Sequence, residues 1–130
     1  MTRRLKIAVA DDDRDTREFF EEFLTRLGHD VRAAGDGRRL VELCGEFVPD
    51  LLLTDDALPG LDGLAAAAAV NRDRPVPVVL VSARHDLEPE GKAGGADVLF
   101  LGKPVKEADL REAIESVAAR ADRPPGPGGT

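Results

Sequence analysis

Acidic side chains stand directly after two short apolar runs of this sequence, and they are the residues best suited to chemistry. Asp11 and Asp12 follow the run Leu5 to Ala10, and Asp55 follows Leu51 to Thr54. A carboxylate is costly in apolar surroundings unless it is paired or coordinates a metal, and Mg²⁺ prefers such oxygen ligands. The pattern therefore predicts a divalent metal site built from these acids.

Two further reactive groups follow later apolar runs, a hydroxyl at Ser82 and an ammonium at Lys103, which precedes Pro104. Phosphoryl transfer to a carboxylate needs a nucleophile, a metal, and cationic or donor groups around the phosphoryl oxygens. Asp55 suits the role of nucleophile, Lys103 that of cation and Ser82 that of donor. The set predicts a phosphoryl-accepting site, provided that the fold brings these positions together.

Elements that could do so follow from the hydrophobic pattern. Strands that are apolar throughout rather than alternating are typical of buried parallel sheets. The predicted order is strand then helix, five times, with strands near 5–10, 31–34, 51–54, 76–81 and 97–101 and helices near 13–27, 36–47, 63–71, 86–95 and 107–121. This alternation predicts a doubly wound α/β fold, with five parallel strands and helices on both faces. Ligands bind at the carboxyl ends of such strands, where all the reactive groups above lie.

Composition limits the remaining choices. The chain has 130 residues, a net charge of -7 and a sequence pI near 4.8, which argue for one domain and against direct nucleic-acid contact. No apolar run reaches membrane-spanning length, and no signal peptide is recognisable. The lone Cys44, expected to be buried, fits the reducing cytoplasm. We expect one domain over residues 1–121 and a disordered Pro/Gly-rich tail over 122–130.

Taken together, these residues resemble the receiver (CheY-like) domain of two-component response regulators. The resemblance covers residues 4 to 121 and rests on five segments in the expected order: Val9 to Asp12, Asp55 to Gly63, Leu80 to Ala83, Gly95 to Asp97, and Phe100 to Pro104. It implies the flavodoxin-like (βα)5 fold. It also implies a switch that catalyses its own phosphorylation and slow dephosphorylation, and that does not turn over an external substrate as an enzyme does.

The resemblance implies a role for each site residue. Asp55 accepts a phosphoryl group from a sensor histidine kinase or phosphotransfer protein. Mg²⁺, or Mn²⁺ in its place, is held by Asp12, Asp55 and the carbonyl of Ala57, with Asp11 assisting through water. Lys103 pairs with the phosphoryl oxygens, and its bond to Pro104 is cis. The switch residues Ser82 and Phe100 respond to the phosphoryl group, and the signal passes to an unidentified downstream protein or to a phosphorylation-dependent homodimer.

Some positions depart from the common receiver pattern. Asp56 follows the acceptor where an apolar residue is more usual, and it adds negative charge near the site. The segment between Ser82 and Gly95 contains Pro89 and Gly91, which leaves the length and register of the fourth helix open. We expect this short helix to be a mobile output element held by packing alone.

Plainer interpretations remain for several residues. Asp13 and Asp62 are expected to be helix N-caps, since a helix N-terminus favours acids. His29 is expected at the surface of a turn, and His85 in a loop. Two other functions also fit part of the pattern. A phosphorylation-independent pseudo-receiver would be expected to lose an acid or the lysine, which this chain keeps. A haloacid dehalogenase type phosphatase would use Asp11 to Asp13 as Asp-x-Asp, but would need threonine where Asp15 stands.

Overall fold

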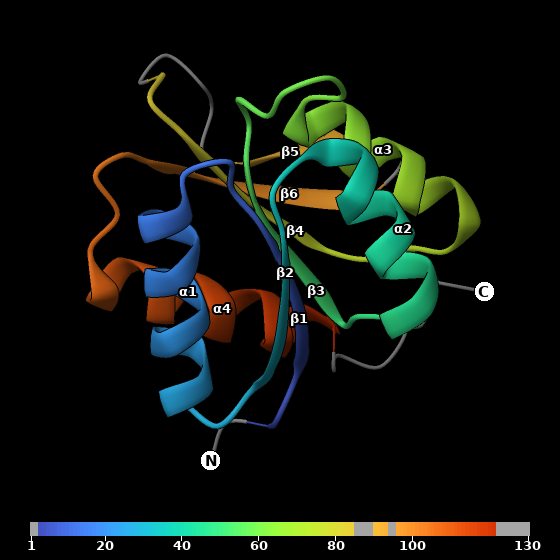
Figure 1. Ribbon diagram of the computed structural model, residues 1–130. Helices are drawn as coiled ribbons and strands as arrows, with labels where there is room; N and C mark the ends of the chain where they lie inside the picture. Colours follow the sequence, from blue (N-terminus) through green and yellow to red (C-terminus); the bar gives the residue numbers. More distant parts are fainter. Residues whose placement is uncertain (1–2, 85–89, 94–95, 122–130) are drawn as a thin grey trace, which may run out of the picture.

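The computed structural model describes residues 3–84, 90–93 and 96–121, which form a twisted sheet between two layers of helices (Figure 1). The elements in chain order are β1 (Lys6–Ala10), α1 (Arg14–Arg26), β2 (Asp30–Ala34), α2 (Gly37–Phe47), β3 (Leu51–Asp55), α3 (Gly63–Asp73), β4 (Val78–Ser82), β5 (Glu90–Ala93), β6 (Ala96–Gly102) and α4 (Glu107–Ala121).

The sheet has the order β2-β1-β3-β4-β6-β5. All neighbouring strands pair in parallel except β5, which runs antiparallel to β6 at one edge. The five parallel strands confirm the predicted doubly wound fold. The strand order reverses between β1 and β3, so the crevice at the carboxyl ends of these two strands is the place where such folds bind ligands.

Successive side chains of a strand point to opposite faces of the sheet, which divides the core into two clusters. On one face, Ile7 and Leu53 lie with Phe20 of α1 and Ile114 of α4. On the other face, the strands supply residues such as Leu52 to a cluster with α2 and α3. Because β1, β3 and β4 carry apolar side chains toward both faces, they are the uniformly apolar strands that the sequence predicted.

Aspartates cap the first three helices. Oδ2 of Asp13 accepts a hydrogen bond of 3.0 Å from the backbone N–H of Thr16, and Oδ1 of Asp62 accepts one of 2.8 Å from Ala65. Asp36 makes the equivalent bond at the start of α2. The cap predictions for Asp13 and Asp62 are confirmed. Capping fixes where α1 and α3 begin, and each begins shortly after an acidic strand end.

The prediction of a fourth helix over 86–95 is wrong for the part that the structure describes, because residues 90–93 form strand β5. Gly91 and Pro89 are poor helix formers, whereas the edge of β6 offers backbone groups for pairing. Gly91 also suits this position, since a Cβ there would lie 3.0 Å from Cε2 of Phe100. Residues 85–89, which include His85, and residues 94–95 lie outside the described part of the chain, as does the tail predicted over 122–130.

Two glycines allow backbone segments to approach closely beside β3. A Cβ on Gly63 would lie 2.0 Å from the carbonyl oxygen of Asp55, and a Cβ on Gly37 would lie 1.8 Å from that of Leu61. Both distances are far below any van der Waals contact. The start of α3 is therefore packed directly against the end of β3, and the start of α2 is packed against the loop between them.

The side chains of Cys44 and His29 are both buried. Cys44 is buried as predicted, and burial raises the pKa of its thiol to about 12. His29 was expected at the surface and is only 5% exposed, so that expectation is wrong. Its Nδ1 accepts a 3.0 Å hydrogen bond from the backbone N–H of Leu5, which places the ring inside the turn.

None of the helices formed by the described residues is long and apolar enough to cross a membrane.

Candidate functional site

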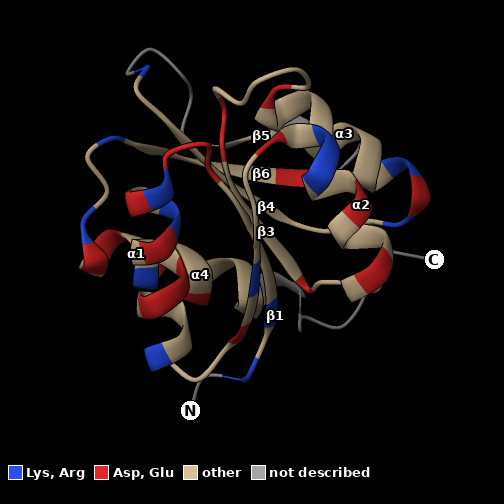
Figure 2. Ribbon diagram, viewed as in Figure 1, with Lys and Arg blue, Asp and Glu red and all other residues tan. Residues whose placement is uncertain are grey.

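Three carboxylates meet at the carboxyl ends of β1 and β3. One oxygen each from Asp11, Asp12 and Asp55 lies within 4.8 Å of the others. The two strands are parallel neighbours with Ala10 opposite Thr54, so the residues that follow both strands emerge side by side. Figure 2 shows the loops after β1 and β3 coloured as acidic segments at the same end of the sheet. Asp11 and Asp55 are buried and Asp12 is exposed, so the cluster opens to solvent on one side.

Asp11 has one satisfied and one unsatisfied carboxylate oxygen among the described residues. Its Oδ1 accepts a 2.9 Å hydrogen bond from the backbone N–H of Asp13, but its buried Oδ2 has no hydrogen-bond partner in the described part of the chain. Burial raises the pKa of Asp11 and the charges of Asp55 and Asp12 add to this, while the bond from Asp13 acts in the opposite direction. A buried carboxylate oxygen that lacks a partner among the described residues, close to two other acids, fits a bound divalent cation.

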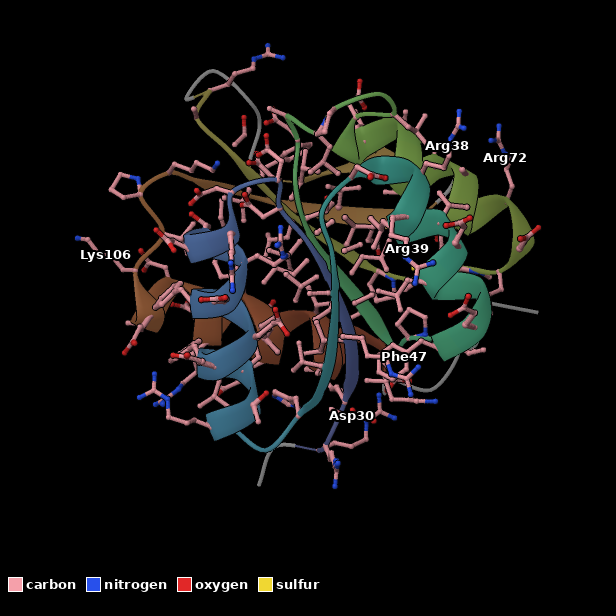
Figure 3. All side chains as sticks on the ribbon, viewed as in Figure 1. Asp30, Arg38, Arg39, Phe47, Arg72 and Lys106 are labelled. Carbon is pink, nitrogen blue, oxygen red and sulfur yellow. The ribbon has the colours of Figure 1, made fainter. Side chains whose placement is uncertain are left out.

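Lys103 supplies the cation of the site. Its Nζ lies 2.6 Å from Oδ2 of Asp55, and the Asp55 side chain is 4% exposed. Burial acts to lower the pKa of Lys103, but the hydrogen bond and charge of Asp55, with the charges of Asp11 and Asp56, outweigh it and raise that pKa. The peptide bond from Lys103 to Pro104 is cis, as predicted. Lys106, three residues later, is exposed and points away from the body of the molecule (Figure 3).

The other oxygen of Asp55 faces the loop that follows. Oδ1 accepts a 3.2 Å hydrogen bond from the backbone N–H of Ala57. Asp55 is thus held by an ammonium on one oxygen and an amide on the other. Both donors suit a carboxylate, and both would also suit the oxygens of a phosphoryl group attached to it.

Ser82 ends β4, the strand between β3 and β6, and it is 1% exposed. Its hydroxyl donates a 2.7 Å hydrogen bond to Oδ2 of Asp56 and accepts one of 3.0 Å from the backbone N–H of Arg84. The sequence placed Ser82 at the site but gave no sign of this partner. The sequence indicates Asp56 only as additional negative charge, because no sequence pattern predicts the direction of its side chain.

Phe100 lies on β6, three residues before Lys103. The ring is partly buried against the cluster shared by α2 and α3, and Gly91 of β5 is packed beside it. The aromatic ring therefore belongs to the apolar packing between the sheet and these helices.

An apolar cavity of about 550 Å³ adjoins the site on the other side. Lys103 and Pro104 form one wall, and Phe19 and Phe20 of α1 form another. The sequence did not predict this cavity, because its walls come from elements distant in the chain.

The structure is thus a doubly wound α/β domain with a cluster of three acids at its switch point that could hold a metal ion. Residues 7–115 match the family model described as response regulator receiver domain. The chain belongs to this family, whose members are signalling domains of two-component systems rather than conventional enzymes, and which bind Mg²⁺.

Relatives of this chain include whole regulators and isolated receiver domains. The DNA-binding response regulator MtrA of Mycobacterium tuberculosis is 32% identical over 126 residues, 95% of this chain and 55% of MtrA. The transcriptional regulatory protein AfsQ1 of Streptomyces coelicolor is 34% identical over 119 residues, 90% of this chain and 52% of AfsQ1. The Francisella response regulator 1452 receiver domain superposes with a TM-score of 0.80 at 25% identity, covering 92% of this chain and 100% of that one. The chain spans about half the length of the curated relatives it matches.

Proposed function

We propose that Asp55 is the phosphoacceptor of this receiver domain. An Asp55 carboxylate oxygen attacks the phosphorus of a phosphohistidine on a sensor kinase or phosphotransfer protein. The bond from phosphorus to the histidine nitrogen breaks as the bond to Asp55 forms, and the electron pair returns to the imidazole. The observation that carries the proposal is the pairing of a 4% exposed Asp55 side chain with Lys103 beside two further acids.

Lys103 has two tasks in this reaction. Before transfer, its ammonium orients the Asp55 carboxylate through a hydrogen bond of 2.6 Å. During transfer, the same ammonium can pair with the phosphoryl oxygens, because these oxygens carry negative charge throughout the transfer. The backbone N–H of Ala57 supplies a second donor close by.

The acidic cluster fits Mg²⁺, and Mn²⁺ offers the same chemistry. Asp12, Asp55 and the carbonyl of Ala57 would hold the ion, with Asp11 acting directly or through water. Support comes from the buried Oδ2 of Asp11, which has no hydrogen-bond partner among the described residues and lies in one cluster with Asp12 and Asp55. A bound Mg²⁺ neutralises the phosphoryl oxygens, which would otherwise be repelled by three carboxylates.

Ser82 and Phe100 are proposed as the switch. Ser82 would donate its hydroxyl proton to a phosphoryl oxygen on Asp55, and Phe100 would move behind it. The change would then reach the surface formed by β5, since Gly91 is packed beside the Phe100 ring. This strand takes the place that the sequence assigned to a mobile helix.

The partners follow from this reaction. The apolar cavity beside Lys103 offers a contact surface next to the acceptor for a phosphohistidine protein. Residues 1–121 would form the receiver domain, acting in the cytoplasm on a downstream protein or through a homodimer. With a net charge of -7, we expect no direct DNA contact by this chain, although MtrA is described as DNA-binding.

The test is phosphorylation with acetyl phosphate and Mg²⁺. The wild type should gain one phosphoryl group that is lost in alkali, as an acyl phosphate is. Asp55→Asn should gain none, and Asp12→Asn, which removes the exposed acid and leaves the acceptor, should react slowly. Labelling of Asp55→Asn at the wild-type rate would refute the assignment, and a wild type that is never labelled would favour the pseudo-receiver.

A further inference from the structure

The hydroxyl of Ser82 has a single proton, and in this structure that proton is donated to Oδ2 of Asp56 at 2.7 Å. The proposed switch needs the same proton for a phosphoryl oxygen on Asp55. A hydroxyl donates one hydrogen bond at a time, so the two acceptors exclude each other.

We propose that Asp56 is a positioning residue that holds Ser82 in its unphosphorylated orientation and so opposes the switch. This inference rests on the proposed phosphorylation of Asp55 and adds a residue that restrains it. The Asp56 carboxylate competes with the phosphoryl group for one proton, and its charge also lies one residue from the acceptor.

The backbone holds Asp56 where it can act in this way. Its N–H donates a 2.9 Å hydrogen bond to the carbonyl of Val81, the residue before Ser82. Its own carbonyl accepts a 3.0 Å bond from the N–H of Gly63. With both backbone groups tied, the carboxylate is presented to the end of β4. The cluster of acids that could hold a metal consists of Asp11, Asp12 and Asp55, whereas Oδ2 of Asp56 accepts from the Ser82 hydroxyl.

The competition should be moderate in strength. A hydrogen bond to a charged acceptor is stronger than one between neutral groups, which favours Asp56 as partner. Asp56 is only partly buried, so water can replace the lost donor when Ser82 turns away. We therefore expect removal of the carboxylate to strengthen the phosphoryl-bound state by about 3- to 10-fold.

The test uses beryllium fluoride, which binds a carboxylate as a mimic of the phosphoryl group, with Mg²⁺ and the full chain. Dissociation constants are measured for the wild type, Asp56→Ala, Ser82→Ala and the double variant. Asp56→Ala should bind the mimic about 3- to 10-fold more tightly than the wild type. The double variant should gain less affinity relative to Ser82→Ala, because the hydroxyl proton is then missing. Asp56→Asn removes the charge but keeps an oxygen acceptor, so it should fall between the wild type and Asp56→Ala.

The backbone amide of Arg84 gives an independent readout, because it donates to the Ser82 hydroxyl oxygen at 3.0 Å. Its nuclear magnetic resonance signal in mimic-free Asp56→Ala should shift toward its position in the mimic-bound wild type. A merely structural role for Asp56 would lower the melting temperature without this directed shift.

The outcomes are separable. Equal tightening with and without Ser82 would mean that Asp56 acts through charge alone, and weaker binding by Asp56→Ala would mean that it supports the site. Either result overturns the inference while leaving the acceptor assignment intact. A wild type that neither binds the mimic nor is labelled by acetyl phosphate would instead overturn the proposed function.

Discussion

Nζ of Lys103 and Oδ2 of Asp55 lie 2.6 Å apart, although the strands that carry them are not neighbours in the sheet. Asp55 ends β3, Lys103 follows β6, and β4 lies between them. The lysine therefore reaches across the end of β4 to the acid. The pair joins the two sides of the site, and a phosphoryl group attached to Oδ2 would have to enter between these two atoms.

Lys103→Met should destabilise the protein in the absence of metal. The substitution leaves the buried Asp55 carboxylate without its ammonium, which we expect to lower the free energy of unfolding by about 1 to 3 kcal/mol. Urea unfolding with a chelator measures it. Lys106→Met is the matched control, because that side chain is exposed, and it should change little. Equal effects of the two variants would show that the ion pair adds nothing to stability.

Mg²⁺ should stabilise the wild type, and at ten times its dissociation constant the gain is about 1.4 kcal/mol. The gain should shrink as the pH falls, because the raised pKa of Asp11 lets a proton compete with the ion. In the absence of metal, the contribution of Asp11 to the free energy of unfolding has the opposite pH dependence. A protonated Asp11 contributes its whole stabilisation below pH 3.8, the ordinary pKa of an aspartate. This stabilisation is lost as the pH rises through the raised pKa of Asp11 in the folded state.

The check is urea unfolding of the wild type and Asp11→Asn between about pH 4.5 and 7.5, with and without Mg²⁺, a range in which a raised carboxyl pKa is felt. Asp11→Asn should be more stable than the wild type in the absence of metal at neutral pH, and it should flatten the pH dependence. A magnesium effect that is the same at every pH would contradict the role given to Asp11.

His29 should make the protein sensitive to mild acid. Burial lowers its pKa from 6.5, and its Nδ1 must stay unprotonated to accept from the N–H of Leu5. The neutral His29 ring contributes its whole stabilisation above pH 6.5. This stabilisation is lost as the pH falls through the lowered pKa of His29 in the folded protein. Imidazole resonances should report a pKa below 6.5, and His29→Gln should remove this part of the pH dependence. A ring that titrates at or above 6.5 would argue against the buried acceptor.

Val48→Gly should stabilise the fold. Val48 ends α2 with a φ of 52°, a left-handed conformation that a β-branched residue adopts only with strain. Glycine removes a strain of about 1 to 2 kcal/mol and gives back about 0.5 to 1 kcal/mol in chain entropy, so the net gain should be under about 1.5 kcal/mol. The side chain is 49% exposed, so little packing is lost. Val48→Ala keeps a Cβ and serves as the control, and an equal gain from alanine would mean that φ is not the cause.

The sequence predicted the parts of this structure that depend on local pattern. Uniformly apolar strands indicated a parallel sheet, and parallel strands bring residues such as Asp11 and Asp55 to one edge. The partner of Ser82 could not be predicted, because the direction of the Asp56 side chain depends on backbone bonds to Val81 and Gly63. The burial of His29 depends on Leu5, which is distant in the sequence.

The structure of the segment after Ser82 was also not predictable from local sequence. Pro89 and Gly91 correctly weakened the case for a helix, but they could not indicate what would replace it. Strand β5 forms because β6 offers an edge for pairing, and the availability of that edge is a property of the assembled sheet.

The two sides of the site differ in how easily they can move, and the close approaches of Gly63 and Gly37 make one of them stiff. On the side of α2 and α3, backbone lies directly on backbone, so any shift there must move whole segments. On the side of β4 and β6, the groups that face Asp55 and Asp56 are Lys103 and Ser82, which turn about single bonds. We therefore expect a strain introduced at Asp55 to relax away from the loop that follows it and toward Lys103 and Ser82.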